Sequence, residues 1–128
     1  MIVLVDTSVW IRFLSNRAPY AAELDVLLSR DEVSGHDFVY GELLIGDRGG
    51  RKQLLEDYEH IHQAPIVPHG DVVAFVRARR LHGRGVGWID AHLLASALVG
   101  HLKLWTTDPR LATVANELGI GYGESEEQ

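Results

Sequence analysis

Short apolar runs alternate with helical patterns along this chain, and that alternation limits its fold more than any other feature. The clearest run is Ile2–Val5, four consecutive apolar residues of which two are valine. Such a run is typical of a strand buried on both faces of a parallel sheet. Further strands are expected at Glu32–His36, with Asp37 as the N-cap of the next helix, and at Leu102–Thr106. Strands separated by helices predict an α/β domain with a central parallel sheet and helices on both faces.

The remaining patterns predict helices and a few extended segments within one domain. The capping residues Asp6, Thr7 and Ser8 open the first helix, and further helices are expected over residues 21–28, 38–45, 51–61, 71–81, 88–99 and 109–118. Residues 64–68 are expected to be extended, and residues 120–122 to form an edge strand. Nothing in the composition divides the 128 residues, a usual length for one domain. We expect one domain over residues 1–123 and an acidic, disordered tail over residues 124–128.

Composition excludes several classes of protein. The chain has no cysteine, which rules out disulfides and thiolate metal sites, and its seven histidines lack the spacing of a zinc site. No apolar run approaches the roughly 20 residues of a membrane span, and the N-terminal segment lacks the pattern of a secretory signal. We therefore expect a cytoplasmic protein with no membrane association. Twelve Lys and Arg against eighteen Asp and Glu give a net charge of −6, which argues against a nucleic-acid partner.

Four acidic residues nevertheless lie where a ligand site is expected. Ligands of open parallel sheets bind beyond the carboxyl ends of the strands, and Asp6 and Asp108 each follow an expected strand. Glu42 and Asp90 lie within apolar helical segments. Taken singly, each acid has an ordinary alternative as a helix N-cap or an exposed helix residue. If they converge, the carboxylates repel one another, and a hard divalent cation such as Mg²⁺ or Mn²⁺ offsets that cost.

Four segments that contain these acids resemble one known family. They are Val5–Trp10, Tyr40–Leu43, Ile89–Ala95 and Thr106–Asp108. In this order and at these separations they are similar to the PIN-domain family, and more narrowly to the VapC ribonuclease toxins of bacterial and archaeal toxin–antitoxin pairs. The resemblance extends from Val3 to about Tyr122, and it implies a three-layer domain with a central parallel sheet flanked by helices.

The resemblance also implies an activity and a set of site residues. Asp6, Glu42, Asp90 and Asp108 would be the catalytic, metal-binding acids, and Thr7, Ser8 and Thr106 would orient the carboxylates or the attacking water. The implied activity is Mg²⁺- or Mn²⁺-dependent endoribonuclease cleavage that leaves a 5′-phosphate and a 3′-hydroxyl. The implied partners are RNA, a VapB-type antitoxin and a second copy in a homodimer. Some family members carry a further acid where this chain has Arg110, which makes a fully occupied second metal site less expected here.

RNA binding requires local positive charge. Four arginines precede Asp90 closely, namely Arg77, Arg79, Arg80 and Arg84. Arg77 and Arg79 have a solvated helix face as their alternative, and we assign Arg80 and Arg84 to the RNA backbone. Trp88, beside the glycine-rich loop and Asp90, is predicted to stack on an unpaired base. Trp10 and Trp105 lie in apolar patterns and are predicted to be core residues.

Two other functions remain as alternatives. An acidic-pocket α/β phosphotransfer domain would need a second acid beside Asp6, where this chain has Thr7, and a late lysine. A non-catalytic binding module with the same fold is the second alternative. The helical stripes of Trp10, Phe13 and Leu14 and of Leu24, Leu27 and Leu28 are either seats for an antitoxin helix or core. Four of the eighteen acids are assigned to a cation and three to the tail, which leaves eleven acids and twelve basic residues. The remaining charge is nearly neutral and therefore permits RNA binding.

Overall fold

The computed structural model describes residues 1–123. The acidic tail over residues 124–128, predicted to be disordered, lies outside the described residues. Four strands and seven helices follow one another in this part of the chain: β1 (Val3–Val5), α1 (Thr7–Leu14), α2 (Tyr20–Ser29), β2 (Val33–Gly35), α3 (Asp37–Ile45), α4 (Lys52–Tyr58), β3 (His62–Gln63), α5 (His69–Arg79), α6 (Trp88–Gly100), β4 (Lys103–Trp105) and α7 (Pro109–Glu117).

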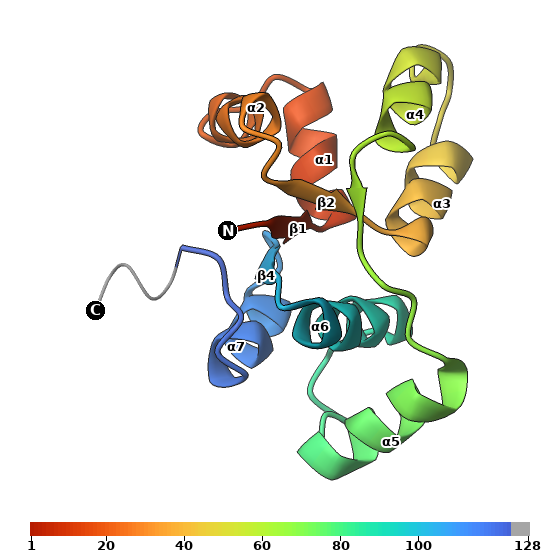
Figure 1. Ribbon diagram of the computed structural model, residues 1–128, viewed down its shortest axis with the longest axis vertical. Coiled ribbons are helices and arrows are strands. Elements are labelled where there is room, and N and C mark those ends of the chain that lie inside the picture. The colour runs from red at the N-terminus through yellow and green to blue at the C-terminus, as the bar shows by residue number, and fades with distance from the viewer. Residues whose placement is uncertain (124–128) are drawn as a thin grey trace.

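The strands form one parallel sheet in the order β3-β2-β1-β4. The apolar run of β1 is central, since Leu4 pairs with Ser34 on one side and with Leu104 on the other. Helices α1 to α4 lie on one side of this sheet and α6 and α7 on the other, with α5 outside α6 (Figure 1). The α/β fold with a central parallel sheet between helical layers is therefore confirmed.

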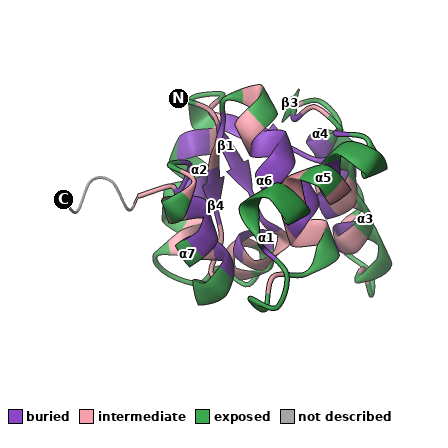
Figure 2. Cartoon of the chain, turned by 90° about the horizontal axis from the view of Figure 1, so that it is seen from below, coloured by how far each residue is buried: buried purple, intermediate pink, exposed green. Residues whose placement is uncertain are grey.

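The core fills the space between the sheet and the two helical layers, as the purple central strands of Figure 2 show. Trp10 and Trp105 are buried in it, as their apolar patterns predict. Leu24 and Leu27 are buried too, because α2 packs on α1. Since an occupied core position is not available to a partner helix, Trp10, Leu24 and Leu27 serve the core. Phe13 and Leu28 are half-buried, and Leu14 is exposed.

Three local predictions were wrong. His36, not Asp37, is the N-cap of α3, because its Nδ1 accepts the backbone N–H of Phe38 at 3.0 Å. The helix expected to reach residue 61 ends at Tyr58, whose carbonyl accepts a hydrogen bond from the Gln63 side chain. The chain then turns so that residues 62 and 63 pair with β2. The edge strand expected over residues 120–122 is reduced to a single bridge between Gly121 and Leu104.

No helix within residues 1–123 is long and apolar enough to cross a bilayer.

Candidate active site

The four acids identified in the sequence come from four separate elements. Asp6 follows β1, Glu42 lies in the middle of α3, Asp90 lies in the first turn of α6, and Asp108 stands between β4 and α7. Because β1 and β4 are adjacent and parallel, their carboxyl ends bring Asp6 and Asp108 to the same edge of the sheet. Electrostatic repulsion from all three of the others acts on Asp90, which places the four carboxylates in one neighbourhood.

Asp6 is held by hydroxyl groups and does not act as a side-chain cap. It occupies the N-cap position of α1, but its carboxylate accepts no backbone N–H of that helix. Its Oδ2 accepts hydrogen bonds from Ser8 Oγ at 2.8 Å and from Thr106 Oγ1 at 2.7 Å. The same two hydroxyls accept the backbone N–H groups of Thr107 and Asp108, both at 3.1 Å. Two hydroxyls thus fix the buried carboxylate of Asp6 to the end of β4 and aim one of its oxygens.

Glu42 and Asp108 each have a neighbour that orients the carboxylate. Thr7 Oγ1 donates to Glu42 Oε1 at 2.6 Å and joins the start of α1 to α3. Asp108 is a true N-cap, because its Oδ1 accepts the backbone N–H of Arg110 at 2.9 Å. The sequence-based alternative of a helix cap therefore holds for Asp108, and capping leaves its second oxygen for other partners.

Asp90 carries the electrostatic signature of the site. Burial is the largest of the causes that together raise the pKa of Asp90 to about 6. The negative charges of Asp6, Asp108 and Glu42 act in the same direction, and a hydrogen bond from the Gly87 N–H opposes them. A carboxylate whose pKa is raised by burial and by other acids at a sheet edge is a candidate for a functional site.

The donor set fits a hard divalent cation. Four carboxylates supply only oxygen ligands, and their mutual repulsion is the energy that a cation would relieve. As the side chains stand, no three Asp, Glu or His groups of residues 1–123 are close enough to hold an ion. Each carboxylate instead accepts hydrogen bonds from its own neighbours. Binding a cation here requires side-chain rotations that draw the carboxylates inward.

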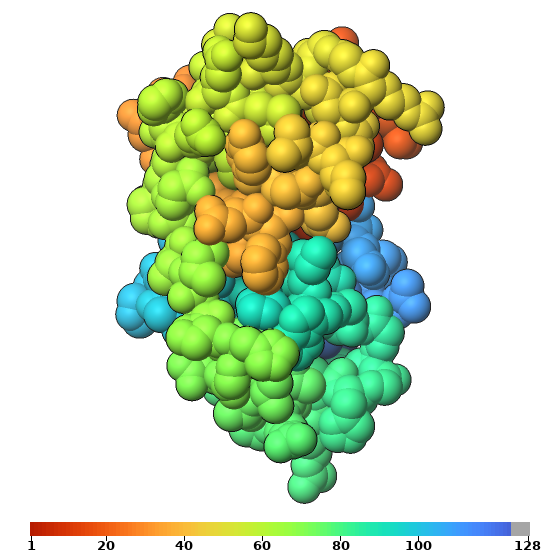
Figure 3. Space-filling view, turned by 90° about the vertical axis from the view of Figure 1, so that its right-hand side faces the viewer, coloured from red at the N-terminus to blue at the C-terminus, as the bar shows by residue number. Residues whose placement is uncertain are grey.

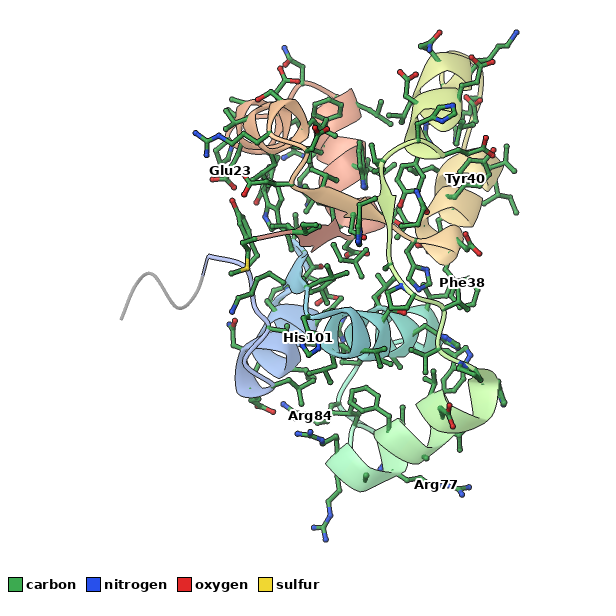
Figure 4. All side chains as sticks on the ribbon, viewed as in Figure 1. Glu23, Phe38, Tyr40, Arg77, Arg84 and His101 are labelled. Carbon is green, nitrogen blue, oxygen red and sulfur yellow. The ribbon has the colours of Figure 1, made fainter. Side chains whose placement is uncertain are left out.

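The residues predicted to bind RNA lie around α5 and the loop before α6. Arg80 is the exposed C-cap of α5 in a left-handed conformation. Arg84 forms two hydrogen bonds with Glu117 of α7, at 2.7 and 2.8 Å, and Figure 4 shows it beside that helix while Arg77 points outward from α5. Trp88 is 44% exposed, and its ring lies against His69 and His92. His92 itself is buried.

An apolar groove adjoins the acids between α3 and α6. It has a volume of about 400 Å³, and its lining includes Phe38, Ile45, Trp88 and Ile89 together with the acid Glu42. The start of α3, in orange, lies against the start of α6, in teal, on the face of Figure 3. Ile45 is 88% exposed beside it. Sequence reasoning missed this surface, since it described the apolar residues of α3 only as the surroundings of Glu42.

Sequence reasoning also gave no role to Arg110. Its Nε lies 3.8 Å from Asp108 Oδ1, and its side chain runs past Gly85 in the loop before α6. The sequence did contain a signal for Arg110, since an arginine stands there where some members of the family carry an acid.

Comparisons with known proteins agree with this fold. A sequence model of the PIN domain matches residues 3–117. The chain belongs to the PIN domain family. It is 45% identical over 123 residues to Ribonuclease VapC32 of two Mycobacterium tuberculosis strains, a match that covers 95% of this chain and 97% of those proteins.

Two solved structures share the fold. FitAcB from Neisseria gonorrhoeae has a TM-score of 0.60 at 23% identity, covering 90% of this chain and 94% of that chain. PAE2754 from Pyrobaculum aerophilum has a TM-score of 0.56 at 17% identity, covering 93% of this chain and 90% of that chain.

Proposed function

We propose that this chain is a Mg²⁺- or Mn²⁺-dependent endoribonuclease toxin that hydrolyses RNA phosphodiester bonds and is inhibited by a VapB-type antitoxin. The observation that carries the proposal is the gathering of Asp6, Glu42, Asp90 and Asp108 at one edge of the sheet, close enough that the other three raise the pKa of Asp90. The likeness to Ribonuclease VapC32 over nearly the whole chain supports the substrate class.

Asp6, Glu42, Asp90 and Asp108 would hold the cation. When bound, a divalent cation supplies a water of lowered pKa and offsets negative charge on the scissile phosphate. The remaining chemistry belongs to the chain. Ser8 and Thr106 aim Asp6, and Thr7 aims Glu42, through hydroxyl donors that need no change of protonation near neutral pH.

Arg80, Arg84 and Trp88 form the proposed RNA-binding surface. Arg80 is exposed with no ion pair among the described residues, so its guanidinium is available to a phosphate. Arg84 exchanges its ion pair with Glu117 for an ion pair with a phosphate at a small cost in free energy, because the pair with Glu117 is exposed to solvent. The half-exposed ring of Trp88, fixed between His69 and His92, offers a face to an unpaired base.

The proposed partners act at two different surfaces. The antitoxin places a basic side chain among the four acids, where negative charge is concentrated. A second copy of the chain packs on the apolar face that Leu44 and Ile45 expose beside the groove. Ile45→Glu should then convert a dimer to a monomer in light scattering, while Ile66→Glu, at another exposed isoleucine, should leave the mass unchanged. A monomeric wild-type protein contradicts the dimer. Because RNA is the proposed substrate, we propose a cytoplasmic location for the protein.

RNA cleavage by purified protein tests the proposed function. We expect Mn²⁺-dependent products with 5′-phosphate and 3′-hydroxyl ends, and we expect Asp6→Asn and Asp90→Asn to abolish them while the melting temperature shows folded protein. Asp25→Asn, at an exposed position of α2, is the control and should cleave like the wild type. Cleavage retained by both site variants contradicts the carboxylate mechanism. A wild type that binds no Mn²⁺ and cleaves nothing favours a non-catalytic binding module.

A further inference from the structure

Arg110 stands apart from the other cations of the described residues because it alone lies within ion-pair distance of one of the four acids. It is the second residue of α7, and its Nε is 3.8 Å from Asp108 Oδ1. The side chain is 68% exposed, and within residues 1–123 its two terminal nitrogens make no hydrogen bond. Arg110 therefore presents free donors at the rim of the acidic site.

The loop before α6 leaves room for the side chain of Arg110 at Gly85. Gly85 has a φ of +80°, and a Cβ placed there would lie 2.7 Å from Arg110 Cδ and 2.9 Å from Nη1. The backbone conformation favours glycine at this position, and the absence of a Cβ leaves room for the passing arginine. The loop is fixed on α7 by the paired hydrogen bonds between Arg84 and Glu117. The arginine lies between Asp108 and the loop that leads to Asp90.

The negative charge of the four carboxylates gives a cation at position 110 a role in binding the substrate. Four carboxylates around one divalent cation leave a net negative charge, which repels the phosphodiester that the proposed reaction must bind. A guanidinium at the rim offsets part of that charge and matches phosphate oxygens with two parallel N–H groups.

We propose that Arg110 is an RNA-phosphate-binding residue, which passes Gly85 and lies beside Asp108, and which supplies positive charge at the rim of the site. The inference rests on the proposed function. It adds a contact outside the surface formed by Arg80, Arg84 and Trp88, and it assigns the loop a role in placing a cation.

The salt dependence of RNA binding tests this contact without relying on cleavage. Anisotropy of a short fluorescein-labelled single-stranded RNA is measured in EDTA over a range of NaCl concentrations. For single strands, each lost phosphate contact reduces the slope of log K against log salt by about 0.7. Arg110→Gln should show this reduction and bind several-fold more weakly, whereas Arg110→Lys should keep the slope. Arg30→Gln, which precedes β2 at the opposite end of the sheet, should behave like the wild type.

A second pair of variants tests the part played by the loop. Gly85→Ala should reduce the slope as Arg110→Gln does, because the new Cβ displaces the arginine. In the Arg110→Gln background the same substitution should change the slope no further. An additional loss in the double variant contradicts the placement by Gly85.

Three results overturn the proposal: a slope unchanged in Arg110→Gln, an equal reduction in Arg30→Gln, or no RNA binding by the wild type in EDTA. The first means that Arg110 serves only its ion pair with Asp108. Mn²⁺-dependent cleavage by the wild type, measured on the same preparation, separates the two proposals. If the wild type cleaves and the slope of Arg110→Gln is unchanged, the phosphate contact alone is wrong. If the wild type does not cleave, the proposed function fails.

Discussion

His36 makes the stability of this domain depend on pH in a way that can be worked out from its contacts. The side chain is fully buried, its Nδ1 accepts the N–H of Phe38, and its Nε2 lies 3.0 Å from Ser96 Oγ. Because Nδ1 is an acceptor, the neutral ring carries its proton on Nε2 and donates to Ser96. A second proton would break the cap of α3. Burial is the main cause that lowers the pKa of His36 to about 4, a net value in which Asp37 opposes the shift and His92 adds to it.

The sign and size of the effect follow from this shift. Between pH 6.5 and 4 the unfolded chain binds a proton at His36 that the folded chain does not. His36 therefore contributes its full stability above pH 6.5 and loses that contribution as the pH falls toward 4. A shift from 6.5 to about 4 corresponds to a total loss of about 3 kcal/mol, of which about 2 kcal/mol is lost by pH 5.

Urea unfolding of the wild type and of His36→Asn from pH 7.5 to 5 measures this loss. Asparagine keeps a cap acceptor but does not titrate, so the difference between the two free energies of unfolding isolates His36. We expect the wild type's advantage to shrink by about 2 kcal/mol by pH 5. His60→Gln supplies the background from an exposed histidine. An advantage that stays constant over this range refutes the assignment of a buried, neutral His36.

Further predictions concern the site, the helix α3 that carries Glu42, and the strand β2 that precedes this helix. Thr106→Val removes the hydroxyl that donates to buried Asp6. We expect the free energy of unfolding in urea to fall by about 1–3 kcal/mol and RNA cleavage to slow at least tenfold. Cleavage at the wild-type rate contradicts the role of this hydroxyl. Gly41→Ala should stabilise α3 by about 0.5–1 kcal/mol, since nothing lies within 4 Å of the added Cβ. Gly35→Ala should destabilise, because its Cβ would lie 2.8 Å from Tyr58 Cε1; equal effects of the two substitutions would show that packing does not distinguish them.

The sequence predicted the elements whose local pattern agrees with their place in the fold. The run at residues 2–5 is apolar because β1 lies in the middle of the sheet, and Asp6 follows it directly. By contrast, β3 consists of His62 and Gln63, which are exposed and polar. Their extended form comes from pairing with β2 at the edge of the sheet, and no local pattern carries that information.

The same distinction applies to the site. The four acids could be found from their positions after strands and within apolar helices, together with the family resemblance. The contacts that orient them could not, because Thr106 reaches Asp6 across 100 positions of sequence and Thr7 reaches Glu42 across 35. Side-chain partners of this kind depend on the completed fold.

Mn²⁺ binding measured by titration calorimetry on the wild type and on Asp90→Asn tests the central claim most directly, since it asks whether the four carboxylates act as one site. We expect the wild type to bind Mn²⁺, and we expect Asp90→Asn to bind it at least tenfold more weakly with an unchanged melting temperature. Binding of equal affinity in the two proteins, or no binding by the wild type, would contradict it.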